Sequence, residues 1–295
     1  MQKFHPTSVL VPIDYSVSSL RAAETARSLT DDVNITLIYV GLDFDLVVPS
    51  HNWSTDAPGN TPVRHEKRLR ELRDDNGLGA VNTRVEFGDP GTEVCKVAEE
   101  LKTQLVVLPS HGRHGLKRLL LGSVAERIVR HCDCSVLVLR RDADESDVAE
   151  AHGFPKSSVL VPIDFSASSQ HAIDSALETA ERPEAVHVLN VVYELEDPTL
   201  IGNQVVTDDT RRAGRQEYLE RWLAEHGYKG IQAKVATGDP GIMIVDYAES
   251  LGAGLIVMPS HGYHGLKRLV LGSTTERVIR YATSPVLVLR RHDAE

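Results

Sequence analysis

Two loop segments carry residue types that bind phosphate groups. PSHGRHGLKRLLLGS begins at Pro109 and PSHGYHGLKRLVLGS begins at Pro259, and the two segments differ at two positions. Their glycines allow a ligand to approach the backbone closely. Each Gly-Ser pair, Gly122-Ser123 and Gly272-Ser273, opens a predicted helix, whose free N–H groups and dipole attract an anion. The sequence therefore predicts a phosphate site at both pairs.

A carboxylate follows a short apolar run in each half of the chain. Asp14 ends the run VLVPI, and Asp164 ends an identical run. Such a run fits a buried parallel strand, and ligands of parallel sheets bind beyond the carboxyl ends of the strands. There the carboxylate can accept hydrogen bonds from a ribose or a base. The alternative is that each aspartate only caps the turn that follows it.

Several of these residues also have a structural interpretation that requires no ligand. Ser123-x-x-Glu126 and Ser273-x-x-Glu276 fit a helix capping box, which either stands alone or leads to phosphate contact. The pairs His111/His114 and His261/His264 lack carboxylate or cysteine partners at metal-site spacing, so we expect no metal site. The chain has no G-x4-G-K-[S/T], G-x-S-x-G or H-E-x-x-H motif, and we expect no catalytic residues.

An internal repeat shows which elements position these residues. Most landmarks recur after 150 residues, as when Gly88-Asp89-Pro90-Gly91 returns as Gly238-Asp239-Pro240-Gly241. Apolar runs and caps in the first copy predict an α/β domain in the order β-α-β-α-β-α-β-α-β, with a five-stranded parallel sheet and helices on both faces. The predicted strands span 8–13, 35–40, 81–86, 105–108 and 136–139, and the predicted helices span 16–29, 61–72, 90–102 and a stretch from 122.

Composition limits where the protein acts and what it binds. The 295 residues are 41% hydrophobic and 25% charged, as in soluble globular proteins, and the net charge of −10 disfavours nucleic acid and anionic membranes as partners. No signal peptide or membrane-spanning run is evident, so we expect a cytoplasmic protein. Cys95, Cys132 and Cys134 have no second Cys-x-Cys pair for zinc and are expected to be structural or incidental thiols.

These motifs together resemble those of the universal stress protein (UspA-like) family. That family carries G-x2-G-x9-G-[S/T] after its fourth strand and an aspartate after its first. Gly112 and Gly262 are each followed by nine residues and then Gly-Ser, but Pro109 and Pro259 replace the leading glycine of the motif. The resemblance implies two tandem Rossmann-like (adenine nucleotide alpha hydrolase-like) domains. The expected boundaries are a first domain over 1–141, an acidic linker over 142–156 and a second domain over 157–295.

The resemblance also implies a ligand and its contacts. It implies ATP, with Mg²⁺ held by the phosphates, bound by a non-catalytic stress-response or regulatory module. Alternatives are a nucleotide-free dimerising scaffold and a weak ATP-hydrolysing enzyme. The repeats are expected to form a pseudo-dimer within the chain, and whether two chains associate stays open. The implied contacts are Pro12, Ile13, Asp14, Val40, Leu108, Gly112, Gly122, Ser123 and Val124, then Pro162, Ile163, Asp164, Val191, Met258, Gly262, Gly272, Ser273 and Thr274.

Overall fold

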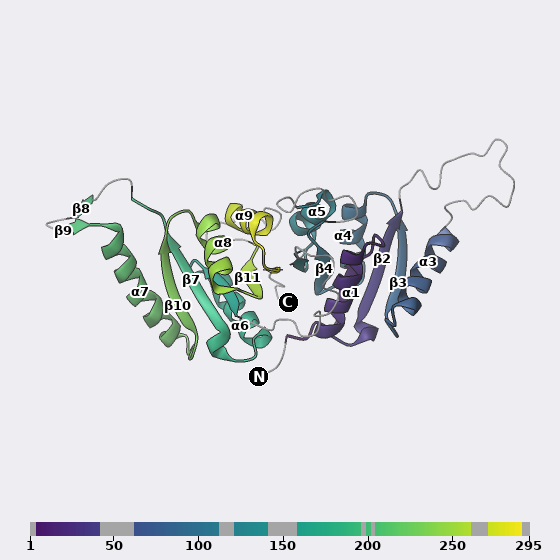
Figure 1. Ribbon diagram of the computed structural model, residues 1–295, viewed down its shortest axis with the longest axis horizontal. Helices are drawn as coiled ribbons and strands as arrows, with labels where there is room; N and C mark the ends of the chain where they lie inside the picture. The colour runs from purple at the N-terminus through teal and green to yellow at the C-terminus, as the bar shows by residue number, and fades with distance from the viewer. Residues whose placement is uncertain are drawn as a thin grey trace. The chain divides into compact units, whose positions relative to one another are not determined.

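The computed structural model describes residues 4–41, 62–111, 121–140, 158–195, 199–201, 204–260 and 271–290. The chain divides into two compact units that follow the two repeats. The expected acidic linker and the glycines Gly112 and Gly262 lie outside the described residues. Each unit is described by itself below, with the labels of Figure 1.

The first unit is an α/β domain around a parallel sheet in the order β3-β2-β1-β4-β5. The element order predicted from the sequence is confirmed, with a short 3-10 turn added before the second strand. The elements are β1 (Val9–Pro12), α1 (Val17–Leu29), η1 (Asp32–Asn34), β2 (Ile35–Gly41), α3 (Pro62–Asp75), β3 (Asn82–Phe87), α4 (Pro90–Glu100), β4 (Leu105–Pro109), α5 (Ser123–His131) and β5 (Ser135–Leu139).

Strand order and handedness place helices on both faces of this sheet. Right-handed crossovers put α1 and α3 on one face, and the reversal of direction after β3 puts α4 and α5 on the other. The contacts agree, because α3 packs on β2 and β3 while α4 packs on α5. The central strands are almost wholly apolar, and Leu10, Leu37 and Leu105 are fully buried. Such a core needs strands that are hydrophobic on both faces.

The second unit repeats this architecture in the order β10-β7-β6-β11-β12. In Figure 1 helix α7 lies along β10, as α3 lies along β3. The elements are β6 (Val159–Ile163), α6 (Ala167–Thr179), η2 (Pro183–Ala185), β7 (Val186–Val192), β8 (Thr199–Ile201), β9 (Gln204–Val206), α7 (Asp208–Glu225), β10 (Gln232–Thr237), α8 (Pro240–Leu251), β11 (Leu255–Pro259), α9 (Ser273–Tyr281) and β12 (Val286–Leu289).

Two features separate the second unit from the first. The antiparallel pair β8–β9 forms a small sheet of its own that the sequence did not lead us to expect. The register of β7 is shifted by one residue, because Val9 pairs with Ile35 whereas Val159 pairs with Val186. Val191 therefore lies in β7 where Val40 lies in β2.

A disulfide joins two of the cysteines that we expected to be thiols. Cys95 lies in α4, and Cys132 caps the carboxyl end of α5. Packing of these helices brings the two Cα atoms to 4.8 Å although 37 residues separate them in sequence, which is why spacing alone did not reveal the pair. Cys134 is buried and takes no part in this disulfide. In the second unit Val245 and Ala282 stand at the two bonded positions.

Candidate functional site

The candidate site of the first unit begins at the turn after β1. The Oδ1 of Asp14 accepts hydrogen bonds from the Ser16 N–H at 3.0 Å and from the Ser16 hydroxyl at 2.5 Å. Ser16 in turn caps α1, where its hydroxyl oxygen accepts from the Ser19 N–H. The turn-capping role expected as an alternative for Asp14 is therefore present. An ionised carboxylate offers about four acceptor positions in all.

The second unit builds the same turn with the same backbone donor but a different hydroxyl donor. The Oδ1 of Asp164 accepts from the Ser166 N–H at 3.1 Å and from the Ser169 hydroxyl at 2.9 Å. The residue after each aspartate has a left-handed backbone, with φ of 63° at Tyr15 and 64° at Phe165. Bulky side chains rarely adopt this conformation, and strained residues of this kind gather at functional sites.

A guanidinium group lies over the ring of each strained residue. The Arg68 guanidinium carbon lies 4.0 Å from the Tyr15 ring centroid, and that of Arg215 lies 5.0 Å from the Phe165 ring centroid. Both arginines come from the helix that covers the same face, α3 in one unit and α7 in the other. These cation–π contacts help to hold the turns that present Asp14 and Asp164.

The second part of the site is the N-terminus of α5. Its N-cap is Gly122, and no side chain caps the first turn, so the capping box expected from Ser123 and Glu126 is absent. Ser123 instead occupies the first helical position and is exposed, while Glu126 accepts from Arg130. Among the described residues, therefore, no side chain occupies the N–H groups of this turn. Helix α9 repeats the arrangement, with Gly272 as the N-cap and no capping side chain.

Backbone bonds tie this helix end to the sheet. The Ser110 N–H donates to Leu139 O at 2.8 Å, and the Gly122 N–H donates to Ser110 O at 2.8 Å. A Cβ on Gly122 would lie 3.3 Å from Ser110 O, a tight contact that favours glycine there. Ser260 and Gly272 make the equivalent bonds at 3.0 and 2.9 Å. Since β4 pairs with β1, the uncapped helix end lies at the sheet edge that carries Asp14.

The remaining predicted contacts lie near the carboxyl ends of the strands, except Val124, Ser273 and Thr274, which lie in the first turns of α5 and α9. Ile13 and Leu108 are buried, while Pro12, Val40 and Val124 are partly exposed. In the second unit Pro162, Ile163 and Met258 are buried, and Val191 and Thr274 are partly exposed. Asp164 and Ser273 are exposed. The structure thus places the described members of each set at the carboxyl edge of one parallel sheet, where ligands of such sheets bind.

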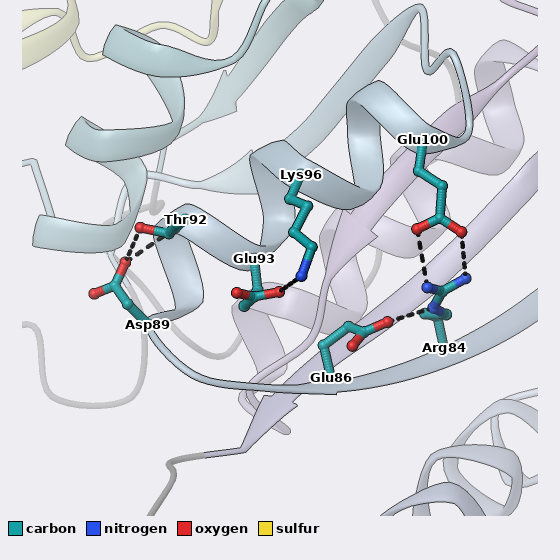
Figure 2. A network of polar contacts seen from close by, with 7 residues as sticks. All are labelled: Arg84, Glu86, Asp89, Thr92, Glu93, Lys96 and Glu100. Carbon is teal, nitrogen blue, oxygen red and sulfur yellow. Dashed lines mark hydrogen bonds and ion pairs between the residues drawn. The ribbon is translucent and has the colours of Figure 1, made fainter.

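The repeated Gly-Asp-Pro-Gly motif holds α4 against α5. Figure 2 shows Asp89 accepting at the start of α4 from the N–H and hydroxyl of Thr92. Asp89 also pairs with Arg127 of α5 at 2.6 Å, and Asp239 pairs with Arg277 at the same distance. The bonds from Thr92, then that from Arg127, lower the pKa of Asp89, whereas the Arg277 guanidinium is the main cause of the lowered pKa of Asp239. The sequence did not lead us to expect these arginine contacts.

Comparison with known proteins agrees with this geometry. The model of the universal stress protein family matches residues 6–140 and again residues 157–290. The chain belongs to the universal stress protein family. A family member from Mycobacterium tuberculosis is 31% identical over 243 residues, which cover 81% of this chain and 79% of the relative.

Other members of the family match one repeat or the whole fold. The universal stress protein YxiE of Bacillus subtilis is 34% identical over 146 residues, covering 45% of this chain and 99% of that protein. The crystal structure of a universal stress protein from Archaeoglobus fulgidus covers 99% of both chains with a TM-score of 0.65 and 22% identity. The tandem arrangement and the α/β fold expected from the sequence are confirmed.

Neither a metal-binding cluster nor a membrane-spanning helix is found among the described residues. Within those ranges, no group of three or more His, Cys, Asp and Glu side chains is placed to hold a metal ion. None of the described helices combines the length and apolar character that crossing a membrane requires.

Proposed function

We propose that each repeat binds an adenine nucleotide and that the chain acts as a non-catalytic regulatory module. The observation that carries this proposal is the uncapped N-terminus of α5, held at the carboxyl edge of the sheet beside the Asp14 turn. Helix α9 and Asp164 provide the equivalent pair in the second repeat. An uncapped helix end suits phosphate, and a carboxylate at the switch point of the sheet suits a ribose.

The proposal gives each part of the site a task. The N–H groups of Ser123 and Val124 donate to phosphate oxygens, Asp14 accepts from the ribose, and Pro12, Ile13, Val40 and Leu108 surround the base. In the second repeat the N–H groups of Ser273 and Thr274 donate to the phosphate oxygens, and Asp164 accepts from the ribose. The base is surrounded there by Pro162, Ile163, Val191 and Met258. The glycines at 112, 122, 262 and 272 admit the phosphates. Mg²⁺ accompanies the nucleotide and is held by the phosphates themselves.

Two other functions remain distinct alternatives. A nucleotide-free scaffold is favoured by one observation, since the Oδ1 of Asp14 already accepts two bonds from Ser16. A weak ATP-hydrolysing enzyme would need a general base or nucleophile beside the phosphates, and no sequence motif supplies one. A cytoplasmic location and the assembly of the repeats or of two chains stay predictions.

Co-purified nucleotide is the first test of the proposal. The purified chain is denatured, and the supernatant is separated by ion-exchange chromatography alongside adenine nucleotide standards. We expect adenine nucleotide from the unaltered chain and none from Gly122→Val/Gly272→Val. Circular dichroism of the folded variant controls for loss of structure. Absence of nucleotide from both proteins would favour the scaffold, and equal amounts from both would contradict binding at these two glycines. Continuous ATP turnover that Asp14→Ala abolishes would favour the enzyme.

A further inference from the structure

The two repeats differ sharply at one place beside the candidate nucleotide sites. The register of the sheets makes Asn190 of β7 equivalent to Tyr39 of β2. By the same register Thr237, at the end of β10, is equivalent to Phe87, at the end of β3. Two aromatic side chains in the first repeat are thus replaced by two small polar ones in the second.

In the first repeat aromatic rings fill this position. The Tyr39 ring stacks on the buried His65 ring of α3 with centroids 4.8 Å apart, and the His65 ring meets the edge of Phe87 at 6.0 Å. Cross-strand neighbours point to the same face, which is the face that α3 covers. The first repeat therefore offers aromatic surface at this position.

In the second repeat a fixed amide takes the place of the Tyr39 ring. Asn190 is only 4% exposed, and its Nδ2 donates to the Ile163 carbonyl oxygen at 2.8 Å. Because a carbonyl can only accept, this bond determines which end of the amide is the oxygen. Ile163 is the last residue of β6 and directly precedes Asp164, so the amide is anchored at the ligand edge of the sheet.

The side-chain oxygen of Asn190 is a buried acceptor that needs a hydrogen-bond donor. The Oδ1 of Asn190 is buried and accepts no hydrogen bond from any residue that the structure describes, and the buried Oγ1 of Thr237 has no partner within the same ranges. Asn190 pairs with Val235, two residues before Thr237, so both oxygens belong to one face of the sheet. Buried polar atoms are nearly always hydrogen-bonded, so each of these oxygens calls for a donor that the described residues do not supply.

We propose that Asn190 selects the base of the nucleotide in the second repeat. This inference rests on the proposed function. The Oδ1 of Asn190 accepts an N–H from the amino group of the base, and the Thr237 hydroxyl supports the contact. A keto base would place its own oxygen, a second acceptor, against the Oδ1 of Asn190. Neither of these two oxygens can donate a hydrogen bond to the other. The second repeat therefore prefers an amino purine over a keto purine, and the first repeat does not make this distinction.

The experiment isolates the second repeat and exchanges one group of the base. In a Gly122→Val background, ATP and inosine triphosphate are titrated by calorimetry into the chain with Asn190 and into its Asn190→Leu variant. Inosine triphosphate carries a keto group where ATP carries the amino group. We expect a preference for ATP of at least about tenfold with Asn190, because sites built to hydrogen-bond a ligand reject the mismatched analogue. In the Asn190→Leu variant the two affinities should converge.

Two further variants separate recognition from folding. Thr237→Val keeps the side-chain shape and the Asn190 anchor, and it should reduce the preference for ATP by a smaller factor. Tyr39→Phe in a Gly272→Val background is the control for the first repeat, where the ratio of the two affinities should not change.

The outcomes distinguish this inference from the proposed function. If ATP does not bind to the Gly122→Val chain at all, the proposed function fails for the second repeat and the inference fails with it. If ATP binds but inosine triphosphate binds equally well, or the preference survives in Asn190→Leu, only the inference is overturned. In that case the acceptor is met by water, which occupies buried polar sites of this kind.

Discussion

Tyr15 and Phe165 hold equivalent strained positions, but only Tyr15 carries an ionisable hydroxyl. Burial raises the pKa of Tyr15 to about 12, against an ordinary value of 10.0, while the nearby Arg68 charge lowers it in part. The folded chain therefore keeps this proton at a pH where the unfolded chain has released it. The resulting stabilisation is complete below pH 10.0 and is lost as the pH rises through about 12.

Replacing Tyr15 by phenylalanine should remove this pH dependence. Tyr15→Phe also removes a buried hydroxyl that has no hydrogen-bond partner among the described residues. We expect the free energy of unfolding to fall less steeply between pH 10 and pH 12, by at most about 1–2 kcal/mol after allowing for solvent screening. Urea denaturation across this range measures the effect. Tyr193→Phe, at a residue that is 66% exposed, is the control, and equal slopes for Tyr15→Phe and the unaltered chain would contradict the prediction.

At the scale of elements, the position of α5 depends on a glycine in α4. A Cβ on Gly91 would lie 2.7 Å from Cδ and 2.8 Å from Cβ of Arg127, and Gly241 makes the same close approach to Arg277. The Gly-Asp-Pro-Gly motif thus combines a helix cap with a surface on which an arginine of the next helix lies. This contact positions the helix whose N-terminus is the proposed phosphate site.

Two glycine-to-alanine changes should have opposite effects on stability. Gly91→Ala forces α5 away from α4 and should cost about 1–3 kcal/mol of unfolding free energy. Gly214→Ala lies within α7, where a Cβ would meet nothing within 4 Å, and should add about 1 kcal/mol through helix propensity. Chemical denaturation compares the two variants. A neutral or stabilising Gly91→Ala would show that the contact does not position α5.

The disulfide between α4 and α5 gives the first repeat a constraint that the second lacks. Cys95→Val/Cys132→Ala copies Val245 and Ala282 of the second repeat. We expect this variant to lose about 2–4 kcal/mol of stability, as for other disulfides that close loops of this size. Thermal unfolding with and without dithiothreitol is the measurement. The reductant should lower the midpoint of the unaltered chain and leave the variant unchanged, and an unaffected midpoint in the unaltered chain would argue against the bond.

The sequence predicted most of these elements because local rules determine them. Pro90 after Asp89 specifies a helix start, and the structure has the aspartate cap there. Three features could not be predicted in the same way. The disulfide, the Arg127 contact and the Asn190 anchor each depend on how elements distant in sequence pack together. The predicted capping box was wrong for a different reason, because Gly122 occupies the N-cap position that the pattern assigns to Ser123.

At the scale of the whole molecule, the duplicated sequence gives two similar candidate sites that differ in the residues around them. Both repeats pair an aspartate turn with an uncapped helix end. The first adds a disulfide and the stacked rings of Tyr39 and His65, while the second adds Asn190 and the β8–β9 pair. We therefore expect the repeats to bind nucleotide with different affinities and base preferences, while the fold around them stays the same.

The central claim is that each repeat binds an adenine nucleotide at its uncapped helix end. Calorimetric titration of ATP into the unaltered chain, the two single variants Gly122→Val and Gly272→Val, and the double variant tests it most directly. The account predicts one ATP per repeat, loss of one site in each single variant, and no binding in the double variant. Absence of binding heat in the unaltered chain, or binding by the double variant equal to that of the unaltered chain, would contradict it.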